Sequence, residues 1–114
     1  MNFLVRLIIT GIIAFGLASF IPGIHLDSVW TGIILALILA FLNTLLKPLL
    51  IIFTLPLTIL TFGLFLFVIN ALIILLADYF IRGFAVDGFW WALLFSLLLS
   101  FITSILFKES NRKD

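Results

Sequence analysis

Residues 29–47, VWTGIILALILAFLNTLLK, decide the fold of this chain. The first charge of the stretch is its last residue, Lys47, and the apolar side chains before it are nearly continuous. A helix needs about 20 predominantly apolar residues to cross a bilayer, whereas the strands of a membrane β-barrel alternate apolar and polar side chains. The stretch therefore predicts a transmembrane helix over about 29–46.

The whole chain resembles this stretch in composition. It has 114 residues, of which 66% are apolar and 10% are charged, a net charge of +1, and no cysteine. A soluble domain has about 25% charged residues, and a nucleic-acid-binding domain carries a basic patch that is missing here. These numbers exclude a soluble domain, a disordered chain and a nucleic-acid partner, and they predict an all-α integral membrane protein. The lipid bilayer is its expected partner.

Proline, glycine and charged residues divide the chain into four expected spans, at about 3–21, 29–46, 63–81 and 89–107. We expect residues 1–107 to form one four-span domain and residues 108–114 to form a charged cytoplasmic tail.

The segment between the second and third spans is the difficult part. Residues 48–81 would form a single helix of about 51 Å at 1.5 Å per residue, and the hydrocarbon core is only about 30 Å thick. Pro48, Pro56 and Gly63 are the available breaks. We therefore expect an extra proline-containing segment at about 48–62 that does not cross. It is an interfacial helix, a shallow re-entrant hairpin or an extension of the neighbouring helices.

The distribution of cations predicts the orientation. With four spans and a cytoplasmic N-terminus, Arg82 is the only Lys or Arg outside, and the positive-inside rule favours this topology over five spans. Both termini are then cytoplasmic, and the expected location is a bacterial cytoplasmic membrane. The cations placed inside are Arg6, Lys47, Lys108, Arg112 and Lys113.

The chain also aligns with itself at a shift of 60 residues. Residues 3–47 and 63–107 share 12 identical positions among 45 pairs, including the Asp27–Asp87 and Trp30–Trp90 pairs. Internal repeats are common in small membrane folds. We therefore predict two tandem helical hairpins in the same orientation, which is a parallel repeat with a period of about 60.

Small residues occur at every fourth position of the second and fourth spans. Such rows let helix backbones approach closely in lipid, so we expect helix packing there and hypothesise that the two spans face each other. A row of serines in the fourth span could alternatively line a pore in an oligomer. The rows are Gly32, Ala36, Ala40 and Thr44, and Ala92, Ser96, Ser100 and Ser104.

Two aspartates each precede an apolar helix, with a tryptophan three residues later. An aspartate at a helix N-terminus caps free amides, and a tryptophan at that depth belongs to the aromatic belt of a membrane protein. We therefore interpret Asp27 and Asp87 as helix caps, and Trp30 and Trp90 as interface anchors. The alternative is an outer cation or ligand site.

Three polar residues are expected inside the membrane. Asn43 and Lys47 lie one turn apart near the inner end of the second span, and Asn70 lies within the third. Polar groups in hydrocarbon need partners. Either the two asparagines hydrogen-bond across helices while Lys47 extends to the headgroups, or the three side chains form a pocket for a lipid headgroup or ion.

The sequence contains no set of catalytic residues. His25 is the only histidine, and the acidic residues are scattered, so neither a nucleophile with its base nor a metal site can be assembled. Asp78 lies one turn before Arg82, and we expect these two to form a surface ion pair. We predict a non-enzymatic protein without a metal or cofactor.

Several of these residues also form a recognisable pattern. The order Asn43-Thr44-Leu45-Leu46-Lys47-Pro48, Leu55-Pro56, Gly63-Leu64-Phe65 and Asn70-Ala71, followed by 83–90, GFAVDGFW, resembles phage holin family 4, the small four-span bacterial membrane proteins that include the YvlD-like proteins. The resemblance covers about residues 1–107. It implies a cytoplasmic-membrane protein with four spans and a role in the cell envelope. It implies a role in cell lysis only weakly.

Three functions remain open at this point. The first is a packing or oligomerising envelope protein that engages lipid or a membrane-protein partner. The second is a holin-like or regulated permeability factor, and the third is a small transporter or lipid-translocating subunit.

Overall fold

The apolar runs fold into helices in the computed structural model, which describes residues 2–111 of the chain. Two short strands join them at one end of the molecule. In chain order the elements are α1 (Phe3–Phe20), β1 (Ile24–Leu26), α2 (Val29–Phe41), the π-helical turn η1 (Leu42–Leu46), α3 (Lys47–Phe53), α4 (Leu55–Leu60), α5 (Phe65–Phe80), β2 (Phe84–Val86) and α6 (Phe89–Asn111).

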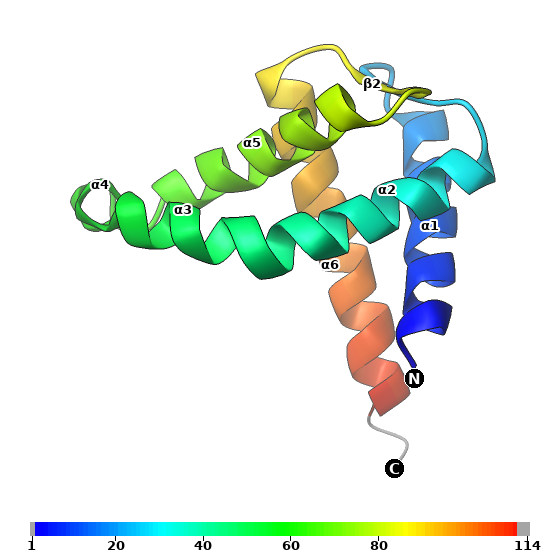
Figure 1. Cartoon of the computed structure of the whole chain (residues 1–114), viewed down its shortest axis with the longest axis horizontal. Coiled ribbons are helices and arrows are strands. Elements are labelled where there is room, and N and C mark those ends of the chain that lie inside the picture. The colour runs from blue at the N-terminus through cyan, green and yellow to red at the C-terminus, as the bar shows by residue number, and fades with distance from the viewer. Residues whose placement is uncertain (1, 112–114) are drawn as a thin grey trace.

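The helices form two arms that diverge from the strands (Figure 1). Arm one consists of α1 and α6, which pack against each other and lead to the two chain ends. Arm two consists of α2, η1, α3 and α5, and it leads to α4. The arms are joined because α1 packs extensively on α2, and α5 on α6. The two arms therefore separate from each other on the side away from the strands.

The two strands correct the all-α prediction. β1 and β2 pair antiparallel, with His25 opposite Ala85 at the centre. The bonds continue reciprocally beyond the strands, because Asp27 N donates to Gly83 O and Asp87 N donates to Gly23 O, both at 2.9 Å. Each loop has backbone groups that need partners, and only the folded chain places the other loop alongside.

Two glycines bring α1 and α2 into close contact. A Cβ atom on Gly32 would lie 2.6 Å from the carbonyl oxygen of Gly11, and one on Gly11 would lie 2.6 Å from the backbone of Ile33. Both positions are buried. The small residue at the start of the α2 row therefore packs against the first helix of its own hairpin, as close packing in lipid requires.

The second and fourth spans, which we hypothesised to face each other, border the same cavity and do not pack in extensive direct contact. The helix pairs in extensive contact are α1 with α2, α5 with α6, and α1 with α6, and α5 makes smaller contacts with α2 and α3. Within the described residues, α2 and α6 are not such a pair. The divergence of the two arms separates them over their second halves, where their small residues line a cavity instead.

The second span extends further than the sequence indicated. We expected it to end at Lys47-Pro48, but the helix continues through η1 and α3 to Phe53. A proline inside an α-helix clashes with the carbonyl four residues earlier, which here belongs to Thr44. The wider π turn, in which Lys47 N donates to Leu42 O, accommodates Pro48 without ending the helix.

The end of arm two is a short helix followed by a tight reversal. Pro56 lies in the first turn of α4, where a missing N–H costs least. Phe62 and Gly63 then take the left-handed conformation, with φ of 56° and 88°, and α5 begins. Residues 48–62 are thus an extension of the second span followed by α4 and a turn.

By length and composition, three helices within residues 2–111 are able to cross a membrane: Phe3–Phe20, the continuous helix Val29–Phe53, and Phe89–Lys108. The apolar helix α5 has 16 residues and is shorter. The structure is therefore a mostly helical membrane protein with three to four apolar helices, consistent with four spans. Of the expected tail, residues 108–111 continue α6, and residues 112–114 lie outside the described part.

The contact between α1 and α2 predicts the effect of a single methyl group. Gly32→Ala places its Cβ against the Gly11 backbone, so the helices must separate, and overpacking of this kind costs about 1–3 kcal/mol. We expect a lower melting temperature of the purified protein in detergent. Gly16→Ala is the matched control, since a Cβ there meets no atom within 4 Å. Equal melting temperatures for the two variants would contradict the close packing.

Candidate functional site

Two neighbouring cavities lie between the arms, on the side away from the strands. The larger, about 440 Å³, is lined by the first half of α1, the end of α2 with η1, and the second half of α6. The smaller, about 50 Å³, lies between η1, α5 and α6. They share Leu39, Asn43, Leu99 and Ser100 as walls. We call the two together the cleft.

The three polar residues singled out in the sequence lie around this cleft. Asn43, Lys47 and Asn70 all line the smaller cavity, and Asn43 also lines the larger one. The hydrogen bond expected between the two asparagines is not formed, and within the described residues neither amide bonds to another side chain. Both amides therefore keep their donors and acceptors available to a molecule in the cleft.

The π turn determines where two of these side chains lie. Asn43 is inside η1 and Lys47 follows it directly. Single π turns occur often at functional sites because they redirect side chains within a helix. Pro48 therefore affects the site indirectly, through the turn that it imposes.

The larger cavity also contains a cation that the sequence argument used only for topology. Arg6 lines it from α1, and its guanidinium carbon lies 4.7 Å above the centre of the Phe107 ring. A cation over an aromatic face is attracted by the ring quadrupole. Phe107 therefore holds the Arg6 guanidinium at the edge of the cleft.

Hydroxyl groups complete the lining. Thr10 and Thr103 line the larger cavity, Ser96 the smaller and Ser100 both. The Thr103 hydroxyl already donates to the Leu99 carbonyl at 2.8 Å. Sequence reasoning missed the role of Thr10, although the 60-residue shift places it opposite Asn70 and so contained the signal.

The small residues of the two rows lie partly in buried helix contacts and partly along the cleft. The first two members of each row are buried, and the later members are only partly buried or exposed. Ala36, Ala40, Ser96 and Ser100 line the cleft. Small side chains there leave room for the cavity. The buried members are Gly32, Ala36, Ala92 and Ser96; Ala40 is partly buried, and Thr44, Ser100 and Ser104 are exposed.

The residues at the strand end form a separate group. The cap of α2 is Ser28, whose hydroxyl accepts from Thr31 N at 3.3 Å, so the cap assigned to Asp27 is made one residue later. The Asp27 backbone instead bonds across to the second loop. The Asp87 carboxylate lies 3.1 Å from His25 Nε2, with both side chains about half exposed.

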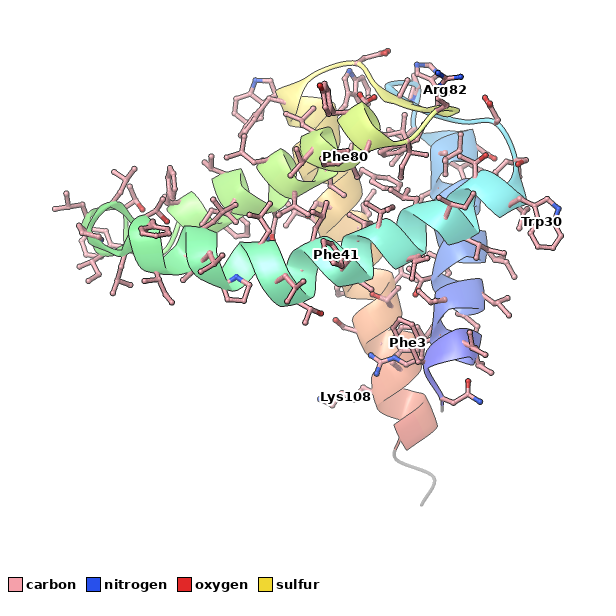
Figure 2. All side chains as sticks on the ribbon, in the orientation of Figure 1. Phe3, Trp30, Phe41, Phe80, Arg82 and Lys108 are labelled. Carbon is pink, nitrogen blue, oxygen red and sulfur yellow. The ribbon has the colours of Figure 1, made fainter. Side chains whose placement is uncertain are left out.

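Asp78 also has a different partner from the one expected. Its carboxylate accepts a hydrogen bond from Val86 N at 3.0 Å, and no ion pair with Arg82 is found among the described residues. The carboxylate at the end of α5 therefore fixes the end of β2. Trp30 and Trp90 are each 76% exposed, and Figure 2 shows Trp30 projecting from the start of α2 and Arg82 lying at the strand end.

The side chains of the cleft can form hydrogen bonds and attract charge. No cluster of three or more histidine, cysteine or acidic side chains is found in the part of the chain that was described. The cleft contains amides, hydroxyls and two cations, and none of the described carboxylates lines either cavity. Such a site attracts anions.

Comparison with known proteins agrees with the membrane architecture. The family described as mycobacterial 4 TMS phage holin, superfamily IV, matches residues 1–105. The uncharacterized membrane protein YvlD of Bacillus subtilis is 44% identical over 97 residues, which are 84% of this chain and 82% of that protein. The uncharacterized protein SCO3922 of Streptomyces coelicolor is 44% identical over 77 residues, 64% of this chain and 62% of that protein. No solved structure matches.

If the cleft is hydrated, a cysteine placed in it will react with a water-soluble thiol reagent. The chain has no cysteine, so single substitutions give unambiguous labelling. We expect Ser100→Cys to react at least about tenfold faster in liposomes than Leu97→Cys on the outer face of the same helix, because the reactive thiolate needs a polar environment. Equal rates would show that the cleft is closed to water.

Proposed function

Since this chain belongs to the family of mycobacterial 4 TMS phage holins, superfamily IV, we propose that it is a non-enzymatic four-span protein of the bacterial cytoplasmic membrane that binds lipid headgroups in its cleft. The cleft carries the proposal. It places the amides of Asn43 and Asn70, which make no side-chain hydrogen bonds in the described structure, beside two cations. Polar groups at membrane depth need a partner, and a headgroup at the inner interface supplies one.

The charges support a topology with both termini in the cytoplasm. Arg6, Lys47 and Lys108 lie in the halves of the helices away from the strands. Arg82 lies at the strand end, where Asp27, Asp78 and Asp87 are also found. The positive-inside rule then places the strands outside and the cleft on the cytoplasmic side. Exposed Trp30 and Trp90 fit the outer interface as anchors.

Backbone pairing and burial support the tandem repeat of 3–47 and 63–107. Each bond between the loops has a counterpart 60 residues away, since Asp27 N to Gly83 O corresponds to Asp87 N to Gly23 O. The pattern of buried and exposed positions is nearly the same in 31–40 and 91–100. We infer two hairpins related by a pseudo-two-fold axis through the centre of the strand pair.

The proline-containing segment fits the inner interface under this topology. α4 and the turn after it lie at the end of arm two, and they contain no charge. Phe62 is 96% exposed and Leu60 is 75% exposed. A short apolar helix with exposed aromatic and aliphatic side chains suits burial at the headgroup boundary. We therefore propose that residues 48–62 end the second span and then lie along the membrane surface.

Lipid retention tests the proposed function. Asn43→Leu removes two donors and an acceptor from both cavities, and loss of a hydrogen bond worth about 1 kcal/mol lowers affinity about fivefold. We expect native mass spectrometry of the full chain, purified in mild detergent, to show co-purified phospholipid that the variant loses. Ser104→Ala, which removes an exposed hydroxyl of α6 that lines neither the cleft nor the apolar groove beside it, is the control. Equal lipid content in all three proteins would refute the proposal.

The topology is tested by labelling from outside the cell. We expect a membrane-impermeant maleimide on intact cells to label Arg82→Cys and not Lys108→Cys, and to label both after permeabilisation. The reverse pattern would invert the protein and move the cleft to the outer leaflet.

There are three alternatives to this proposal. The protein is a holin-like permeability factor, it is a small lipid-translocating subunit, or it acts as a homo-oligomer or in a complex with a membrane-protein partner. A potential-sensitive dye distinguishes the first: we expect no depolarisation when the protein is expressed at a high level. Depolarisation that Ser100→Leu abolishes would favour a pore lined by the α6 hydroxyls.

A further inference from the structure

The charge of the cleft is more specific than lipid binding alone requires. Arg6 contributes one cation to the larger cavity and Lys47 one to the smaller, and among the side chains that the structure describes no acidic one lines either cavity. The described aspartates all lie at the other end of the molecule. The two cavities, which share Asn43 and Ser100 in their walls, are therefore lined by positive and neutral groups within the described part of the chain.

The two cavities resemble halves of one divided site. Each combines one cation with an asparagine and a hydroxyl: Arg6, Asn43 and Thr10 in the larger, and Lys47, Asn70 and Ser96 in the smaller. Asn43 faces both. A ligand that extends from one cavity into the other would therefore have a cation in each half of its site and the Asn43 amide between them.

The donor chemistry matches phosphate oxygens. A guanidinium presents its N–H groups in a planar fork that fits phosphate, and an ammonium acts as a compact point charge. The stacking of Arg6 on Phe107 at 4.7 Å fixes the plane of that fork in advance, so less side-chain entropy is lost on binding. Asparagine N–H₂ and hydroxyl groups add neutral donors.

An apolar groove adjoins the larger cavity and indicates a lipid as the source of the phosphate. It has a volume of about 310 Å³, shares Phe3 and Ala40 with the larger cavity, and is otherwise lined mainly by apolar side chains, among them Leu37, Phe41 and Leu45. An acyl chain attached to a headgroup in the cleft can lie along this groove. A free phosphate anion has no acyl chain to occupy this groove.

We propose that the cleft is selective for a lipid whose phosphate headgroup carries two negative charges, one compensated by Arg6 and the other by Lys47. This inference rests on the proposed function and specifies its ligand class. Lipids with two phosphodiesters or with one phosphate monoester belong to this class. Lipids with a single phosphodiester charge, or zwitterionic lipids, do not.

The test measures binding of four lipids to the full chain in detergent, by thermal shift and by native mass spectrometry. The lipids are cardiolipin, phosphatidic acid, phosphatidylglycerol and phosphatidylcholine. Each basic residue near a membrane contributes about 1 kcal/mol, or about fivefold in affinity. We therefore expect cardiolipin and phosphatidic acid to bind at least about fivefold more tightly than phosphatidylglycerol, and phosphatidylcholine most weakly.

Variants separate the site from general attraction to a basic surface. Arg6→Gln and Lys47→Gln should each lower cardiolipin affinity about fivefold and remove the preference over phosphatidylglycerol. Arg6→Lys should retain part of it, which excludes a folding defect as the cause. Lys108→Gln, which removes a cation from α6 outside the cleft lining, should leave the preference unchanged. An equal loss in Lys108→Gln would overturn the site.

The failures of the two proposals differ. Equal binding of all four lipids, lost in Asn43→Leu, would keep the headgroup site and overturn its selectivity for two charges. No binding of any lipid would overturn both. Displacement of cardiolipin by inorganic diphosphate at concentrations comparable to those of the lipid would overturn the choice of a lipid and indicate a soluble phosphate ligand.

Discussion

The pairing of two loop backbones, residues 24–26 with 84–86, is the contact on which the rest of the structure depends. Each loop joins two apolar helices and has N–H and C=O groups that need partners near the membrane. The loops satisfy each other, and two further bonds extend the pairing to Gly23 and Gly83. Because all four helix ends are fixed around this short sheet, their directions from it decide what the other end of the molecule looks like.

At that other end, the directions of the helices create the cleft. Close contact at Gly11 and Gly32 allows α2 to cross α1 and enter the second arm, away from the chain ends. The arms then separate, and the space between them is bordered by small residues and polar side chains. Large apolar residues at these positions would fill the space. Asparagine, serine and threonine leave it open and make it polar.

Pro48 connects the course of the backbone to the chemistry of the cleft. In water-soluble proteins a proline in this place usually ends or kinks a helix, and here it is accommodated by a π turn that continues the helix to Phe53. The turn contains Asn43, which faces both cavities, and precedes Lys47. One residue that lies outside the cleft lining thus helps to orient two that form it.

The sequence by itself determined the class, the helices and most of the polar residues that matter. Continuous apolar runs such as 29–46 can be stable only in lipid. Asparagine and lysine side chains within them cost free energy unless they have polar partners, and such residues mark functional sites. The tertiary structure decided what local patterns cannot contain. The strand pair needs two loops 60 residues apart, the continuation past Pro48 depends on hydrogen bonds across a widened turn, and the capping side chain is Ser28 instead of its neighbour. Arg6 joined Asn43 and Lys47 for the same reason: periodicity describes one helix at a time, whereas a cleft is formed by the angle between helices.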